Sequence, residues 1–327
     1  ALLDNVTTVL LIAPVALLIT DALRLNPYPY LFSIIFSSNI GGMATLIGDP
    51  PNIMIGSAAH LGFNDFLLNL APLSALIFLL MFLPFYLIWG RKLVAADEDR
   101  AQVMAFDAKA AITDSRLLKQ ALAVIALVLV GFVMAHDVGV EPATIAMFGA
   151  AVLLLLRCLP MQAEDQSHYV HRAFGETEWV TIFFFIGLFV VVAGIKQAGA
   201  LEILAHQIVA ITGGDVKITA SVMLWVSAIA SALVDNIPFV ATMIPVIENM
   251  SPVVGEANVS TLWWSLALGA CLGGNGSLMG ASANLVVAGF AEKAGQPIRF
   301  FPFLWLAFPL MLATVAVSQI YLLLRYL

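Results

Sequence analysis

Long apolar runs separated by short polar connections make up most of the 327-residue chain. Runs of about 20 apolar residues are long enough to cross the hydrocarbon core of a bilayer as helices. The pattern therefore predicts an all-α polytopic membrane protein. Full spans are expected at residues 66–89, 117–135, 142–156, 178–195 and 300–324. A short interfacial helix is expected at 201–211 and a polar loop at 160–177.

Two of the apolar runs, 29–59 and 262–293, are interrupted by glycines, prolines and polar residues. The first contains N-I-G-G-M-A-T-L-I-G-D-P-P-N at 39–52, and the second contains L-G-G-N-G-S-L-M-G-A-S-A-N at 272–284. Lipid offers no hydrogen bonds, so a broken backbone at membrane depth survives only where protein or a water-filled cavity covers it. Each run is therefore predicted to be a broken transmembrane helix.

The interrupted runs share one pattern at an offset of 232 positions. The matched pairs are Gly41 with Gly273, Gly42 with Gly274, Thr45 with Ser277, Gly48 with Gly280, and Asn52 with Asn284. A second motif recurs at an offset of 231, A-L-L-D-N-V at the start and A-L-V-D-N-I at 232–237, which pairs Asp4–Asn5 with Asp235–Asn236. Interrupted segments at corresponding places in two halves are the best sequence pointer to the binding site of a secondary transporter.

The D-N motif is expected to form the tip of a re-entrant hairpin in each half. The second hairpin is expected at residues 216–250. There Asp235–Asn236 lie between two apolar runs that each look too short to span alone. Asp4–Asn5 would be the tip of an equivalent hairpin whose first arm precedes the sequence. We therefore expect roughly a hundred further N-terminal residues in the native protein, because inverted repeats are near-equal halves. The predicted division is a first repeat at 1–92, a linker at 93–116 and a second repeat at 117–327.

Composition and charge fix the class and the orientation. Apolar residues make up 61% of the chain, charged residues 11%, and the mean hydropathy is +0.99, which places the chain in a lipid bilayer. The sequence contains no basic patch, so it does not indicate a nucleic-acid partner. Most of the 14 Lys and Arg residues fall on one side of the predicted topology. By the positive-inside rule that side, with the 93–116 linker, is cytoplasmic and the C-terminus lies outside, which we expect in a bacterial inner membrane.

The D-N and broken-helix motifs resemble those of the ion-transporter superfamily. Within it the chain is similar to the branch of ArsB-type arsenite pumps, NhaD-type sodium/proton antiporters, citrate-transporter-like permeases and P proteins, and the P-protein pattern looks most alike. The resemblance covers nearly the whole chain and is more specific for the branch than for the substrate. It implies two inverted repeats, each with a re-entrant hairpin and a broken helix meeting at mid-membrane, a homodimer and elevator-like alternating access.

The candidate binding site is formed by the two tips and the two breaks. Half-helices that end at mid-membrane attract anions at their starts and cations at their ends. The amides of Asn5, Asn52, Asn236 and Asn284 can replace the hydration shell of an ion, and are the candidate Na⁺ ligands. The predicted solute- and ion-binding residues are Asp4, Asn5, Thr7, Thr8, Gly41, Gly42, Thr45, Gly48, Asn52, Asp235, Asn236, Gly273, Gly274, Asn275, Ser277, Gly280 and Asn284.

Carboxylates and a thiol supply the reactive groups. Asp4 and Asp235 are the first proton-coupling candidates, because a carboxylate at membrane depth is costly unless it is protonated, paired or facing water; the alternative is a cap that accepts its own backbone amides. Asp49 is a third candidate, weighed equally against capping, since its counterpart in the second copy is Ala281. Cys271 is a candidate contact for arsenic, against a packing role.

The substrates that fit the candidate binding site are small solutes. No Lys or Arg lies in the motifs, which counts against a di- or tricarboxylate carrier. Efflux of arsenite or antimonite against protons fits, sodium/proton antiport fits equally well on the residues, and the family name favours arsenite. An ion channel would share the polar midplane. The chain lacks HExxH and GxSxG motifs, so no enzyme is predicted. Nothing indicates a cofactor beyond coupling H⁺ or Na⁺, and an ATPase subunit at the cytoplasmic linker is a further candidate partner.

Overall fold

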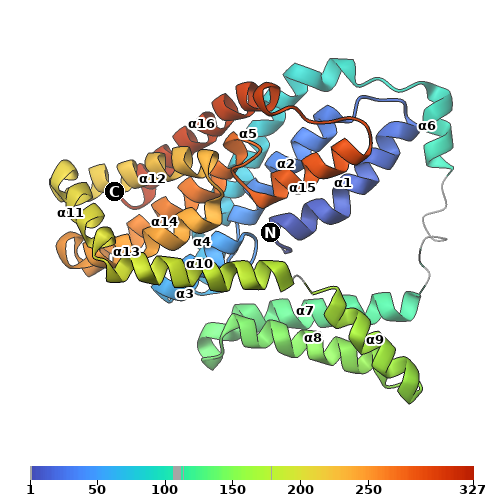
Figure 1. The fold of residues 1–327 in the computed structure, drawn as a ribbon. Helices are drawn as coiled ribbons and strands as arrows, with labels where there is room; N and C mark the ends of the chain where they lie inside the picture. The colour runs from blue at the N-terminus through green and yellow to red at the C-terminus, as the bar shows by residue number, and fades with distance from the viewer. Residues whose placement is uncertain (1, 106–111, 113, 178) are drawn as a thin grey trace. The chain divides into compact units, whose positions relative to one another are not determined.

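A computed structural model describes residues 2–105, 112, 114–177 and 179–327 (Figure 1). Parts of the expected 93–116 linker, and residue 178 at the start of an expected span, lie outside the described residues. Seven of the helices in the described part are long and apolar enough to cross a membrane. The prediction of an all-α polytopic membrane protein is confirmed.

The helices follow the apolar runs closely. The first half contains α1 (Asn5–Ala22), α2 (Tyr28–Met43), α3 (Pro50–Ala59), α4 (Phe63–Asn69), α5 (Ala71–Trp89), η1 (Gly90–Lys92) and α6 (Asp97–Met104). There follow α7 (Ser115–Val138), α8 (Pro142–Cys158), α9 (Ala163–Gly175), α10 (Trp179–Gln197) and α11 (Ala200–Thr212). The last part contains α12 (Val216–Leu233), α13 (Asn236–Val254), α14 (Glu256–Gly273), η2 (Gly274–Gly276), α15 (Ser282–Lys293) and α16 (Phe300–Arg325).

The chain forms two compact units. The first unit comprises Ala1–Leu61, Asp65–Met104 and Leu188–Leu327, and the second comprises Gly62–Asn64 and Ala105–Gly187. All predicted site residues belong to the first unit.

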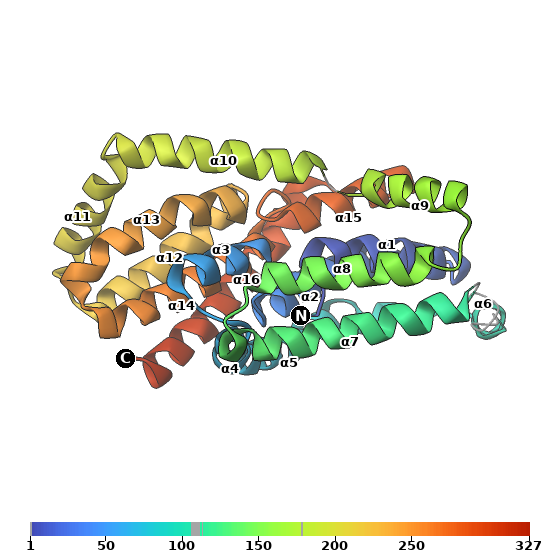
Figure 2. The ribbon, with the colours of Figure 1, turned by 90° about the horizontal axis from the view of Figure 1, so that it is seen from below.

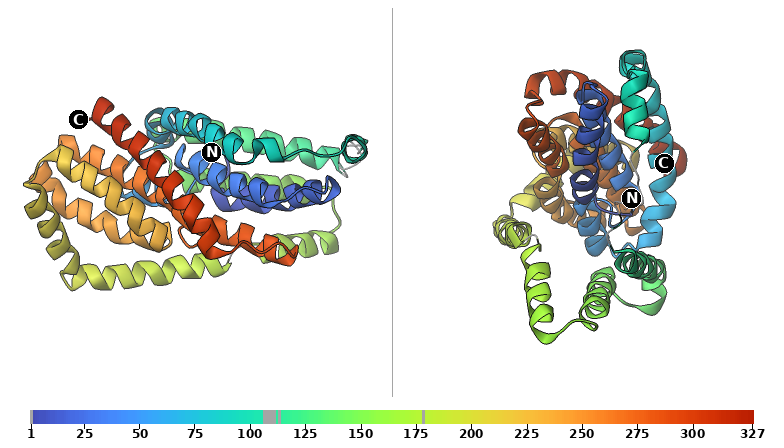
Figure 3. Two further views of the ribbon diagram at one scale, coloured as in Figure 1. Left: turned by 90° about the horizontal axis from the view of Figure 1, so that it is seen from above. Right: turned by 90° about the vertical axis from the view of Figure 1, so that its right-hand side faces the viewer.

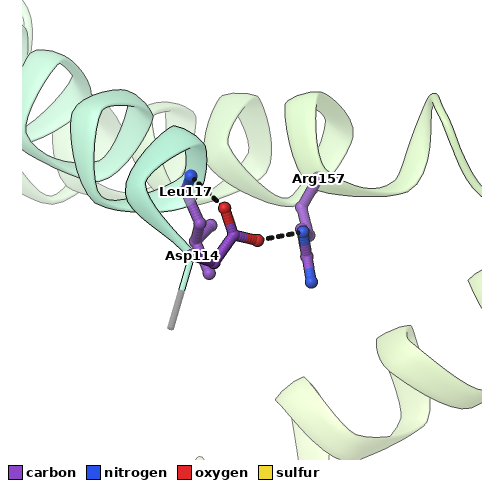
Figure 4. Close-up of polar contacts among 3 residues, drawn as sticks. All are labelled: Asp114, Leu117 and Arg157. Atoms are coloured by element: carbon purple, nitrogen blue, oxygen red, sulfur yellow. Dashed lines mark hydrogen bonds and ion pairs between the residues drawn. The ribbon is translucent and has the colours of Figure 1, made fainter. Parts of the chain in front are cut away.

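In the second unit, α7 and α8 lie side by side (Figure 2). Gly149 of α8 lets the helices approach closely, because a Cβ atom there would meet the Val128 side chain of α7. The Asp114 carboxylate ties the two helices together (Figure 4): its Oδ1 accepts the Leu117 backbone N–H at 2.9 Å, and its Oδ2 accepts the Arg157 guanidinium at 2.8 Å.

This contact predicts a pH dependence. The Leu117 amide, together with Arg157, holds the pKa of Asp114 below the ordinary value of 3.8. A carboxyl group whose pKa is lowered by folding stabilises the fold above its unfolded pKa, and that contribution is lost as the pH falls through the folded pKa. Amide exchange at Leu117, corrected for its intrinsic rate, should therefore accelerate below about pH 4. Asp114→Asn should exchange faster at neutral pH without this acid step; equal protection of wild type at neutral and acid pH would contradict the prediction.

The expected polar loop at 160–177 is wrong, because α9 occupies most of it. Its polar sequence indicated solvent exposure, but the ends favour a helix: Glu164 and Asp165 lie in the first turn and Arg172 in the last, where each sign of charge complements the helix dipole. In the linker, α6 is likewise helical, with an acidic first turn.

In the first unit, the most extensive helix packing is between α12 and α14, and α16 packs against both at an angle (Figure 3). Gly269 and Gly273, one turn apart on α14, lie against the α12 backbone: a Cβ atom on Gly269 would come within 2.5 Å of the Leu224 carbonyl oxygen. Ser231 of α12 donates to the Ala270 carbonyl oxygen at 2.7 Å. Small residues permit this contact, and the serine satisfies a buried carbonyl.

Three details differ from expectation. The arms of the second hairpin, α12 and α13, have 18 and 19 residues and are each long enough to span, so the expectation of two short arms is wrong. The expected span at 66–89 divides between α4 and α5, and α5 begins at Ala71 with Pro72 in its first turn. An aromatic pair in an apolar run is typical of a lipid-facing or interfacial position, but Trp263 and Trp264 are both buried, and Trp264 lies edge-on against Phe66 with ring centroids 5.2 Å apart.

Candidate functional site

The two D-N motifs begin α1 and α13, and both aspartates act as N-caps. Asp4 Oδ2 accepts the Thr7 backbone N–H at 3.2 Å. Asp235 Oδ1 accepts the Ile237 N–H at 3.0 Å, and its Oδ2 accepts the Ser282 hydroxyl at 2.8 Å. Both aspartates are partly exposed. The hydrogen bonds of Asp4 and Asp235 with backbone N–H groups are therefore those of helix caps, the alternative to proton coupling.

Both predicted breaks are present, between α2 and α3 and between α14 and α15. In each, two matched glycines bring the ends of the loop together. A Cβ atom on Gly42 would lie 2.6 Å from the Gly48 carbonyl oxygen, and one on Gly280 would lie 2.8 Å from the Gly274 carbonyl oxygen. Only glycine permits backbone segments to approach this closely.

Asn52 and Asn284, also a matched pair, close the two loops from within. Each lies in the first turn of the second half-helix of its break and donates its side-chain N–H groups back to the loop carbonyls. The acceptors are Gly42, Met43 and Thr45 in the first break, and Gly274 and Ser277 in the second, at 2.7–3.4 Å. The two amides thus satisfy backbone groups that a break leaves without helical partners.

Four buried amides form what we call the asparagine cluster: Asn5, Asn39, Asn275 and Asn284. Asn39 Nδ2 donates to Asn275 Oδ1 and to Asn284 Oδ1, both at 3.0 Å, and Asn39 Oδ1 accepts from Asn5 Nδ2 at 3.0 Å. All four side chains are at most 3% exposed. Among the described residues, Asn5 Oδ1 and Asn275 Nδ2 have no hydrogen-bond partner. The cluster therefore has one free acceptor and one free donor.

Beside it lies the acid–thiol cluster of Asp49, Asn52, Asn236 and Cys271. Asn236 Nδ2 lies 3.3 Å from each carboxylate oxygen of Asp49. The Cys271 thiol donates to Asn52 Oδ1 at 3.4 Å and lies close to Asp49. Asp49 is 1% exposed and, unlike the two tip aspartates, makes no capping bond with its side chain.

Asp49 is a buried acid without a cationic partner in the described part of the chain, where every ion pair involves other residues. Asp4 and Asp235 both interact electrostatically with it and carry the same sign of charge. Burying a lone carboxylate is costly, so such a group binds a proton or a cation. No group of three or more His, Cys, Asp or Glu side chains within the described residues is arranged to hold a metal ion.

The structure brings most of the predicted residues together, but in unequal roles. Thr8 donates to the Asp4 carbonyl oxygen at 2.8 Å, and Ser277 donates to the Ala232 carbonyl oxygen, so both hydroxyls bind backbone. The Gly41 carbonyl oxygen accepts a turn bond. Asn39 and Ser282 were missed. The available signal for Asn39 was its place opening the N-I-G-G motif, where the second copy has Cys271.

Comparisons with known proteins point to transporters. The family model described as "Citrate transporter" matches residues 1–269. An uncharacterized transporter of Mycobacterium tuberculosis is 43% identical over 327 residues, covering 100% of this chain and 74% of the relative. An uncharacterized transporter of Synechocystis is 30% identical, covering 98% and 73%. The human P protein is 33% identical over 404 residues, covering 100% of this chain and 47% of the relative.

Proposed function

The chain belongs to the citrate transporter family, and from this membership we propose that it is a secondary active transporter that moves a small solute in exchange for protons, with Asp49 as the proton-coupling group. Membership in the family and similarity to proteins described as uncharacterized transporters support transport rather than enzyme chemistry. The finer assignments, the solute and the coupling ion, are part of the proposal.

The observation that carries the proposal is the environment of Asp49. Its carboxylate is 1% exposed, in contact with an amide and a thiol and close to two further carboxylates. In such surroundings the carboxylate is stable only when it is protonated or when a cation is bound beside it, so loading and release of that ion change the free energy of the site. This is what coupling requires of a transporter. Asp4 and Asp235, which cap helices, are the alternative coupling groups.

Arsenious acid, or the corresponding antimony acid, is the solute that we propose, moved by efflux. A neutral hydroxylated molecule avoids repulsion by Asp4, Asp49 and Asp235, and its hydroxyl groups suit the buried amides. The buried Cys271 thiol in the acid–thiol cluster is placed to contact a soft element.

Two other solutes have support of their own. The description of the family favours citrate, although a carboxylate would lie close to three aspartates without a basic residue from the motifs. The amide oxygens and Asp49 favour Na⁺, which prefers oxygen ligands; sodium/proton antiport would then be the function. An ion channel has no further observation in its favour.

A flux measurement in reconstituted vesicles distinguishes these solutes. Vesicles containing the protein and a pH-sensitive dye would receive arsenious acid, sodium chloride or citrate in turn. The proposal expects proton movement with arsenious acid, absent from empty vesicles and unchanged when potassium replaces sodium. Proton movement only with sodium would establish antiport, and movement only with citrate would establish a carboxylate carrier. Currents without proton coupling would contradict secondary transport.

The internal arrangement and partners remain part of the proposal. Matched glycines and asparagines make equivalent contacts in the two breaks, which supports two inverted repeats divided as 1–92 and 117–327. We propose with it a homodimer, a cytoplasmic linker at 93–116 that binds an ATPase subunit, and an external C-terminus in a bacterial inner membrane.

A further inference from the structure

Asn39 has a central place that its sequence context did not reveal. It lies on α2, before the first break, and is fully buried. Its side chain contacts a residue at the start of α1, Asn5, and two residues of the second broken segment, Asn275 and Asn284. One amide thus connects the first tip and the first broken helix to the second broken helix.

The residue at the equivalent position in the second copy makes the equivalent contact with the other broken helix. At the offset of 232 that relates the two breaks, Asn39 corresponds to Cys271. Asn39 Nδ2 contacts Asn284 Oδ1 at 3.0 Å, and Cys271 Sγ contacts Asn52 Oδ1 at 3.4 Å. Since Asn52 and Asn284 are themselves a matched pair, these two contacts are counterparts. The Asn39 amide therefore occupies in one half of the site the position that the Cys271 thiol occupies in the other.

We propose that Asn39 is a positioning residue for the solute: it holds the amides of Asn5 and Asn275 so that one free acceptor and one free donor face the same solute, an uncharged hydroxylated molecule. The inference rests on the proposed function and deepens it. Asn39 Oδ1 accepts from Asn5 Nδ2, and Asn39 Nδ2 donates to Asn275 Oδ1, so both side chains are held in place. What is left over is Asn5 Oδ1 and Asn275 Nδ2, both buried and without a partner in the described part of the chain.

The two atoms without a partner, Asn5 Oδ1 and Asn275 Nδ2, determine the chemical class of the solute. The free oxygen accepts an O–H group, and the free N–H donates to an oxygen lone pair. An uncharged molecule with hydroxyl groups satisfies both atoms at once. A metal cation would satisfy only the oxygen, and a fully ionised carboxylate only the N–H. Buried polar groups reject solutes that leave them unpaired, so the pair selects for hydroxylated neutral solutes.

The test compares Asn39→Ala, Asn39→Asp and Ser38→Ala in vesicles with arsenious acid as the probe. Asn39→Asp keeps the shape and the acceptor oxygen but removes the amide donor. Ser38 is the matched control because it is a buried polar neighbour whose hydroxyl, among the described residues, binds only the Ile35 carbonyl oxygen of its own helix, at 2.9 Å. The readout is the KM for arsenious acid and the maximal rate of proton-coupled flux, measured separately.

We expect the KM to rise about tenfold or more in Asn39→Ala and Asn39→Asp, because losing the oriented hydrogen bonds weakens solute binding. The maximal rate should stay within about twofold of wild type, and Ser38→Ala should change neither value. Boric acid, a second neutral hydroxylated probe, should compete with arsenious acid in wild type and compete less well in both Asn39 variants.

Several outcomes would overturn the inference. A KM within twofold of wild type in both Asn39 variants contradicts it, as does a lower maximal rate with an unchanged KM, which a purely structural role would produce. If Asn39→Ala does not fold, the near-isosteric Asn39→Asp decides by the same criteria. Failure of the proposed function is separate, because it shows as absent arsenious-acid flux in wild type, before any variant is compared.

Discussion

Replacing Asp49 by asparagine is expected to reduce proton-coupled solute flux to the level of empty vesicles. The substitution preserves the size and the contact with Asn236 but leaves a group that cannot take up or release a proton. Because the variant removes a buried charge without a cationic partner, the protein should be as stable as wild type or more so. Loss of transport without loss of stability would separate coupling from folding.

The measurement is the initial rate of proton movement on adding arsenious acid, with thermal unfolding in detergent as the stability control. Asp4→Asn and Asp235→Asn belong in the same series. Asparagine is as good an N-cap as aspartate, so these variants retain the helix starts that the structure shows for Asp4 and Asp235. If either of them abolishes coupling while Asp49→Asn retains it, the coupling group is one of the tip aspartates and the assignment to Asp49 is wrong.

Gly48→Ala is expected to destabilise the first break by about 3 kcal/mol, the upper range for overpacking. The added Cβ atom would overlap the carbonyl oxygen and Cα of Gly42, which are backbone atoms and cannot move aside as a flexible side chain can. The Gly48 carbonyl oxygen also accepts the Asn5 backbone N–H at 2.9 Å, so displacement of the loop would disturb the first tip.

A lowered midpoint of thermal unfolding and a lowered flux would appear together in this variant. Gly289→Ala is the matched control: Gly289 lies within α15, and a Cβ atom there meets nothing within 4 Å. Alanine favours the helix over glycine by about 0.8–1 kcal/mol, so the control should be neutral or slightly stabilised. Unchanged stability in Gly48→Ala would mean that the two backbone segments are not held in contact.

The places of the breaks and tips could be predicted from sequence because glycine, proline and asparagine are rare inside apolar runs, and each such group appears twice. The contacts between these places could not. Asn39 binds partners 236 and 245 positions away, and Asp49 binds Asn236 across 187 positions. No local pattern encodes such pairs, so Asp49 could not be distinguished from an ordinary helix cap.

Other differences have local causes. The polar composition of residues 160–177 predicts a loop, but the distribution of charge at the ends of α9 favours a helix. The apolar runs on either side of Asp235–Asn236 look too short to span, yet α12 and α13 are both long enough. Thr219 and Ser231 of α12 are buried, and their hydroxyls donate to backbone carbonyl oxygens. Buried hydroxyls that bond to backbone carbonyls are compatible with a spanning helix.

The inward-facing amides of Asn52 and Asn284 have a mechanical consequence. Because each loop keeps its own carbonyls bonded, it can travel as a rigid body without exposing bare backbone to hydrocarbon. The hinges of any rocking or sliding step would then lie where helices meet, and the unwound segments would keep one shape throughout the cycle.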